Sequence, residues 1–163
     1  MDQRQVRTIA GTFATGVTVV TTIGTNGKPV GMTANSFSSL SLNPPLVLVS
    51  ISKGASLYKD FMETDCFGIN ILSEHQENIS RQFSKKNIDR FTGVAYEKVV
   101  TGAPILPDTI GYFDCTVNQL YDGGDHTIII GEIKHGEVRE GEPLLFYRGK
   151  YRKIEQLNLI GKY

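Results

Sequence analysis

The stretch VTVVTTIGTNGKPVGMTANSF, residues 17–37, decides the fold class. Its first seven residues are rich in β-branched side chains, which favour a β-strand. Asn26-Gly27 follows, and between two extended segments this dipeptide predicts a β-hairpin with a type I′ turn. The return strand is predicted to run from Pro29 to Phe37. The main structure therefore opens with a pair of antiparallel strands.

Similar patterns continue on both sides of this hairpin. Upstream, Val6, Ile9, Ala10 and Phe13 recur at helical spacing, which predicts a short amphipathic helix. Downstream, further strands are predicted at 46–51, 66–72, 113–117, 126–133 and 144–150. The nearly continuous apolar run of the first of these is typical of a strand covered on both faces. Six or seven strands separated by turns, without regular alternation with helices, favour a small antiparallel barrel with flanking helices, a mainly β fold.

Length and composition narrow the function classes. The 163 residues match one domain, 1–163, and contain 40% hydrophobic and 21% charged residues. Seventeen basic and seventeen acidic side chains give a formal net charge of zero, which argues against a nucleic-acid partner. No apolar run approaches the roughly 20 residues of a membrane span, and the N-terminus lacks a signal-peptide pattern, so we expect a cytoplasmic protein. Cys66 and Cys115 match no metal-ligand spacing, and no metal site is expected.

The usual catalytic signatures are missing. The chain has no GxGxxG after the first strand, no GxxxxGK[ST], no HExxH and no GxSxG. These absences argue against a dinucleotide-binding α/β fold, a P-loop, a zinc protease and a serine hydrolase. Any chemistry must come from less familiar patterns.

The stretch GMTANSFSSLS, residues 31–41, is the first such pattern. It holds small, polar, uncharged side chains at the end of a predicted strand. One interpretation is a solvated strand that runs into a loop. The other is a shelf on which main-chain N–H and C=O groups approach a flat polar ligand such as an isoalloxazine ring.

A second pattern is SISKGAS, residues 50–56, at a predicted strand-to-helix junction. Free N–H groups, hydroxyls and one ammonium suit a phosphate, although a plain N-cap beside a solvated lysine has the same composition. Lys85, Lys86 and Arg90 add charge to such a site or belong to a solvated surface. In the strand 66–72, Gly68 and Asn70 share one face, which is poor core material and predicts that something else lies close over it.

His126 begins a predicted strand after Gly123-Gly124-Asp125. A structural histidine bonded to a nearby carboxylate fits this position. A flat ring that contacts a nicotinamide fits it as well.

Five segments together resemble one known family. They are FATGVTVVTT (13–22), GMTANSF (31–37), SLNPP (41–45), GDHT (124–127) and LFYRGKY (145–151). In this order they are similar to the flavin reductase family with the FMN-binding split-barrel fold. More narrowly, the chain resembles the short reductase components of two-component aromatic monooxygenases, such as the 4-hydroxyphenylacetate and phenol hydroxylase reductases.

The resemblance implies a homodimeric, six-stranded antiparallel split barrel that binds FMN or FAD near the dimer interface. It implies an NAD(P)H-dependent flavin reductase, with NADH (or NADPH) as co-substrate. Hydride would pass from nicotinamide C4 to flavin N5, and the reduced flavin would leave for a partner oxygenase. No protein acid or base is obligatory for that transfer.

The resemblance also implies which residues form the site, from the positions in this sequence that match the family's motifs. The isoalloxazine edge would contact Thr33, Ala34, Asn35 and Ser36, and the ribityl and phosphate end would contact Ser50, Ile51, Ser52, Lys53 and Ser56, with Asn70, Phe83 and Ser84 beside them. The nicotinamide side would contain His126, Tyr147, Gly149 and Tyr151, and only His126 is a candidate catalytic residue.

Three other functions stay open. A non-catalytic FMN-binding electron-transfer protein would bind flavin tightly and barely consume NADH. A flavin-dependent ferric reductase would depend on ferric chelates, and a ligand-free interaction module would bind no flavin at all.

Overall fold

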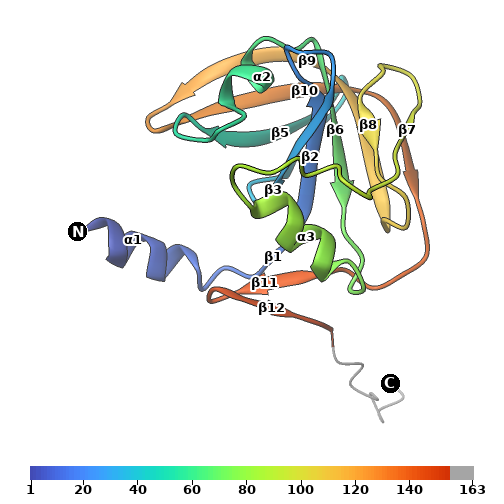
Figure 1. Cartoon of the computed structure of the whole chain (residues 1–163). Helices are drawn as coiled ribbons and strands as arrows, with labels where there is room; N and C mark the ends of the chain where they lie inside the picture. The colour runs from blue at the N-terminus through green and yellow to red at the C-terminus, as the bar shows by residue number, and fades with distance from the viewer. Residues whose placement is uncertain (155–163) are drawn as a thin grey trace.

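The computed structural model describes residues 1–154 and contains three helices and twelve strands in that range (Figure 1). Residues 155–163, which the single-domain prediction includes, lie outside the described residues. The helices are α1 (Gln3–Ala10), α2 (Tyr58–Met62) and α3 (Glu77–Ser84). The strands are β1 (Thr15–Gly16), β2 (Thr18–Ile23), β3 (Pro29–Ala34), β4 (Ser38–Leu42), β5 (Pro45–Ser52), β6 (Cys66–Ile71), β7 (Glu97–Lys98), β8 (Pro104–Ile105), β9 (Gly111–Gly123), β10 (His126–Val138), β11 (Leu145–Tyr147) and β12 (Lys150–Arg152).

The main sheet is antiparallel, in the order β3-β2-β6-β9-β10-β5-β4. Its two edge strands, β3 and β4, are consecutive in sequence and only residues 35–37 join them. The sheet must therefore curl until its edges meet at this link, which makes an incompletely closed barrel. The mainly β, split-barrel prediction is confirmed, but its count of six strands is wrong because the main sheet has seven.

The barrel interior contains one of two apolar clusters. Val20, Val49, Phe61, Phe67 and Ile129 are fully buried members of it, and Phe61 comes from α2. The second cluster packs under α3, through Phe83, and against the segment that joins β8 to β9. These two clusters hold α2 and α3 on the strands that carry the predicted site.

The β2–β3 hairpin differs from its prediction in the turn and in the return strand. Gly27 has φ +76°, whereas Asn26 is not among the residues with positive φ, so the turn is not type I′. The N–H of Gly24 donates to the carbonyl of Lys28 (2.8 Å), which closes a three-residue loop with glycine in the left-handed position. β3 then ends at Ala34 rather than Phe37, because the chain leaves the β2 edge to start β4.

Two further predictions need correction. β5 buries Val47, Val49 and Ile51 and leaves the alternate residues partly exposed, so it is covered fully on one face only. The predicted final strand 144–150 is a hairpin, β11 and β12, which turns at Arg148 (φ +48°) and Gly149 (φ +75°).

The predicted N-terminal helix is present as α1, and Asp2 and Gln5 cap its start reciprocally. α1 ends at Ala10, so the predicted helical residue Phe13 lies beyond it. None of the residues of α1 is buried, and Val6 and Ile9 are 50% and 59% exposed, as is Phe13 at 77%. Figure 1 shows α1 extending away from the barrel. No helix in residues 1–154 has both the length and the hydrophobicity that crossing a membrane requires.

Candidate active site

The free edge of β3 is the base of the candidate site. No strand among residues 1–154 pairs with β3 on the side away from β2. The carbonyl of Gly31 points to this side, since it accepts a hydrogen bond from Arg90 (2.8 Å). Main-chain groups alternate along a strand, so the N–H and C=O of Thr33 point the same way. The first predicted pattern is therefore a strand edge with main-chain donors and acceptors available for a ligand.

Ser36 joins this edge to the end of β5. Its hydroxyl donates to the carbonyl of Ser50 (2.9 Å) and accepts from the N–H of Ser50 (3.1 Å). β4 pairs with β5 only as far as Leu48, so Ser36 takes the place of a strand partner at Ser50. The two predicted stretches 31–41 and 50–56 thus meet across the gap between β3 and β5, which we call the slot.

Arg90 joins the two sides of the slot at its other end. Its Nη1 donates to Gly31, its Nη2 donates to the hydroxyl of Ser56 (3.3 Å), and its Nε donates to the carbonyl of Lys85 (2.6 Å). Burial lowers the pKa of the Arg90 guanidinium. Two of its five N–H groups have no partner among residues 1–154, which makes it a donor to an anion in the slot.

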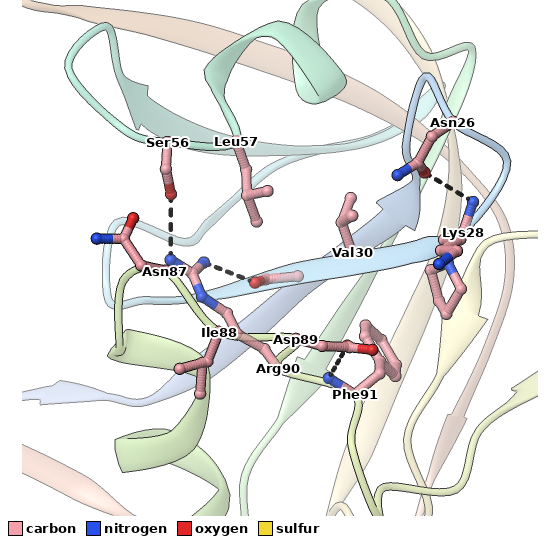
Figure 2. A pocket seen from close by; sticks show the side chains of 12 residues that line it. Asn26, Lys28, Val30, Ser56, Leu57, Asn87, Ile88, Asp89, Arg90 and Phe91 are labelled. Carbon is pink, nitrogen blue, oxygen red and sulfur yellow. Dashed lines mark hydrogen bonds between the residues drawn. The ribbon is translucent and has the colours of Figure 1, made fainter.

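A cavity of about 310 Å³ opens beside Arg90 (Figure 2). Val30, Leu57 and Ile88 form apolar walls, and Asn87 and Ser56 contribute polar groups. The cavity has the size and mixed lining of a small-molecule site.

The turn between β9 and β10 borders the slot on the β5 side. His126 pairs with Ser52 across the two strands, and the N–H of Lys53 donates to the carbonyl of Asp125 (2.9 Å). The Lys53 ammonium forms an ion pair with Asp122. The hydrogen bond with Asp122 raises the pKa of Lys53, so the ammonium stays protonated, and the carboxylate of Asp122 compensates its charge at the predicted phosphate position.

His126 is half-exposed, and its Nδ1 lies 2.6 Å from Oδ1 of Asp125. This contact with His126 is the main cause that lowers the pKa of Asp125. The predicted carboxylate partner is present, and 43% of the His126 side chain stays exposed.

Ser80 connects the other predicted nicotinamide segment to the slot. The hydroxyl of Thr33 donates to the Ser80 carbonyl (2.6 Å), and the Ser80 hydroxyl lies 2.8 Å from the hydroxyl of Tyr151. Arg81 stacks over the Tyr151 ring at 4.8 Å. Nothing in the sequence pattern singled out Ser80, which is fully buried on α3.

Three predicted contacts point elsewhere. Asn70 is fully buried, and its side-chain amide is hydrogen-bonded within the protein to Val19, Thr21 and Leu106. The side chains of Ile51 and Phe83 are fully buried in the two apolar clusters.

The face that Gly68 and Asn70 share is covered by the protein itself. A Cβ added at Gly68 would lie 2.9 Å from the carbonyl oxygen of Pro104, in β8. The prediction that something lies close over this face is therefore right, but the covering group is β8 and not a ligand.

The remaining predicted residues come from four different segments of the chain. Asn35 is exposed, the main-chain carbonyl of Ala34 accepts from Thr18 (2.7 Å), and the Ser84 hydroxyl donates to Arg81 within α3. Tyr147 and Gly149 belong to the β11–β12 hairpin, which Figure 1 places well apart from the β9–β10 turn that carries His126. One described protomer therefore brings these two nicotinamide segments to different ends of the site.

Comparisons with known proteins agree with this geometry. A family model described as "Flavin reductase like domain" matches residues 10–155. The chain is 40% identical over 156 residues to the reductase subunit HsaB of a flavin-dependent monooxygenase from Rhodococcus jostii (strain RHA1), across 95% of this chain and 80% of that protein. It is 41% identical over 155 residues to the FMN reductase (NADH) SmoA of Agrobacterium fabrum (strain C58 / ATCC 33970), across 95% of this chain and 88% of that protein.

A solved structure matches over almost the whole chain. It is the NADH:FAD oxidoreductase SgcE6 of Streptomyces globisporus C-1027 in complex with NAD and FAD fragments. It superimposes with a TM-score of 0.88 at 37% identity, across 96% of this chain and 95% of that chain.

Proposed function

Because this chain belongs to the flavin reductase-like family, we propose that it is an NAD(P)H:flavin oxidoreductase that supplies reduced flavin to a partner monooxygenase. The observation that carries this proposal is the slot. An unpaired strand edge lies on one side, a hydroxyl-rich junction lies on the other, and a partly unsatisfied guanidinium lies at one end. One phosphorylated, flat, polar ligand accounts for all three.

The residues present fit a flavin. The N–H and C=O of Thr33 suit the hydrogen-bonding edge of an isoalloxazine, and Ser36 keeps that edge at a fixed distance from Ser50. We assign the phosphate to Arg90 and Ser56, since Lys53 is paired with Asp122.

A bound flavin would supply N5 as the acceptor for the hydride of nicotinamide C4. The chain's own contribution is orientation, because the main-chain edge and the two side-chain links hold the ring while one of its faces stays open. His126 keeps its place as the one candidate catalytic residue, with Asp125 fixing its ring orientation. Replacing His126 by Ala should lower NADH turnover with saturating flavin, and unchanged NADH turnover would remove this role.

We propose NADH as the usual donor and either FMN or FAD as the flavin. SmoA is named for FMN and NADH, and SgcE6 for NADH and FAD. Neither name decides between the two flavins for this chain.

We also propose a homodimer located in the cytoplasm, with 1–163 as one domain. Val6 and Ile9 lie three residues apart on one face of α1, and no residue of α1 is buried against this chain. An apolar helix face normally packs against another surface, which supports a second copy. Sedimentation at micromolar concentration tests this, and a monomer would contradict it.

The decisive experiment is an anaerobic titration of the purified protein with FMN and FAD, followed by NADH or NADPH, monitored at the flavin absorbance. The proposal predicts flavin binding, bleaching on addition of the nicotinamide, and steady NADH oxidation with free flavin in air. Tight flavin binding without turnover would instead identify an electron carrier, and turnover that requires ferric chelate would identify a ferric reductase. No flavin binding at micromolar concentration would favour an interaction module.

A further inference from the structure

Three arginines from opposite ends of the chain line one open groove of about 710 Å³. Arg4 and Arg7 lie on α1, and Arg148 lies at the turn between β11 and β12. The N–H of Arg148 donates to the carbonyl of Gly11 (2.9 Å), which fixes the turn against the end of α1. We call this concavity, which Thr8 and Thr12 also line, the arginine groove.

The arginine groove carries three positive charges. None of Arg4, Arg7 and Arg148 forms a salt bridge with a carboxylate of residues 1–154. Three guanidinium groups that share one concavity repel one another, so a bound anion would relieve that repulsion. The hydroxyls of Thr8 and Thr12 already donate to the carbonyls of Arg4 (2.9 Å) and Ile9 (2.7 Å), so the guanidinium groups are the charged side-chain donors that the groove offers an anion.

The backbone at Arg148 indicates a built feature. Its φ of +48° lies in the left-handed region, which a long side chain adopts at a cost. The guanidinium lies 5.4 Å from the ring centroid of Tyr147, which further fixes its direction. The fold therefore holds this arginine beside α1 where a glycine or asparagine would be less strained.

The arginine groove borders the hairpin that carries one of the two nicotinamide segments. α1 meets the β11–β12 turn through Gly11, and that hairpin contains Tyr151, which reaches the slot through Ser80. At the other side, Arg7 is near enough to Asp125 to contribute, after His126, to the lowered pKa of that carboxyl. The groove is thus joined to the hairpin that carries Tyr151, and Arg7 interacts electrostatically with the turn that carries His126.

We propose that the arginine groove binds the phosphate groups of the nicotinamide dinucleotide while its nicotinamide ring lies against the flavin. This inference rests on the proposed function and assigns a subsite to it. A pyrophosphate carries two negative charges, and guanidinium groups bind such oxygens in a bidentate manner. No arginine cluster is visible in the sequence, because Arg148 comes from the far end of the chain from Arg4 and Arg7.

The test compares two hydride donors, with flavin at saturating concentration. NADH carries the pyrophosphate, whereas 1-benzyl-1,4-dihydronicotinamide carries the same ring and no phosphate. In the triple variant R4Q/R7Q/R148Q, the KM for NADH should rise about tenfold or more, with kcat changed little. Rates with the benzyl donor should stay the same. Increasing salt should raise the KM for NADH in the natural chain and have a smaller effect in the variant.

Equal rate losses with both donors, or an unchanged KM for NADH, would overturn the proposal. A change in sedimentation with an unchanged KM would show that the arginine groove is a protein interface instead. The three arginines make no contact with the core, so the melting temperature should stay the same, and K98Q, which removes an exposed charge on β7, is the matched control. If the natural chain fails to reduce flavin with NADH, the proposed function itself is wrong. If the natural chain is active and only the variant has a higher KM for NADH, the result concerns the arginine groove alone.

Discussion

Replacing Asn70 by Leu tests whether this buried amide is structural or binds a ligand. Its Nδ2 donates to the carbonyl of Val19 (3.0 Å) and to the hydroxyl of Thr21 (3.1 Å), and its Oδ1 accepts from the N–H of Leu106 (2.7 Å). Leucine has nearly the same shape and none of these bonds. The substitution would therefore leave a buried main-chain N–H and a buried main-chain carbonyl without their side-chain partner.

The expected cost follows from those two groups. Leaving a buried donor or acceptor unsatisfied costs about 1–3 kcal/mol, and replacing the amide by an apolar group regains part of this. We expect the free energy of unfolding to fall by about 3 kcal/mol. For a domain of this size that corresponds to a melting temperature lower by roughly 6–12 °C.

Differential scanning calorimetry measures the melting temperature, and flavin fluorescence measures FMN affinity well below it. Asn118→Ala, on the exposed part of β9, is the control and should change the melting temperature little. The reasoning is refuted if Asn70→Leu melts like the natural chain but binds FMN much more weakly. That result would return Asn70 to the list of ligand contacts.

Three further predictions concern packing, pH and flavin affinity. Gly131→Ala places a Cβ 2.4 Å from Cζ of Phe67, so denaturant titration should show a loss of roughly 1–3 kcal/mol in the free energy of unfolding. Burial raises the pKa of the Cys115 thiol to about 12, so the stability from the protonated thiol is complete below its ordinary value of 9.0 and is lost as pH rises towards 12. Between pH 9.0 and about 12, the free energy of unfolding should depend less on pH in Cys115→Val than in the natural chain. Asp122→Asn frees the Lys53 ammonium, so fluorescence titration should show FMN binding about two- to fivefold more tightly and riboflavin binding unchanged.

Each of these predictions has its own control. Gly16→Ala adds a Cβ with nothing within 4 Å, and an equal loss in both glycine variants would contradict the packing argument. If the free energy of unfolding has the same pH dependence in the natural chain and in Cys115→Val, the thiol does not cause the loss of stability at high pH. In a Lys53→Gln background, Asp122→Asn should no longer tighten FMN; tighter riboflavin binding would exclude a phosphate effect.

The β2–β3 hairpin shows how much of the fold a local pattern predicts. Its β-branched strand and its Asn26-Gly27 turn lie in adjacent residues, so the hairpin was predictable. The turn type depends on the hydrogen bond between Gly24 and Lys28, and the end of β3 depends on the start of β4 at the opposite edge of the sheet. Neither is a property of the residues that form the strand.

Asn70 shows where the interpretation of a pattern stops. The alternation in β6 correctly placed Gly68 and Asn70 on one face, and a face without apolar side chains must be covered by something else. A sequence pattern does not say what covers it. The covering strand, β8, has only two residues and lies in a segment that carries no periodicity.

The site was predictable in its parts and not in its assembly. The sequence predicts two separate stretches with small polar residues, 31–41 and 50–56, and Ser36 joins them in the structure. The sequence does not distinguish Arg90 from Lys85 and Lys86 as a candidate phosphate contact. The distinguishing contact, with the carbonyl of Gly31, connects segments that are distant in sequence. Ser80, a buried serine on a helix, leaves no signal that separates it from other serines.

The unpaired edge of β3 has a consequence for handling the protein. Exposed main-chain donors and acceptors along a strand are a template for a strand of another molecule, and such pairing leads to aggregation. A flavin that covers this edge would suppress that process as well as stabilise the folded state by mass action. Preparations stripped of flavin should therefore precipitate sooner on storage than those kept with FMN, because bound flavin protects this edge against intermolecular strand pairing.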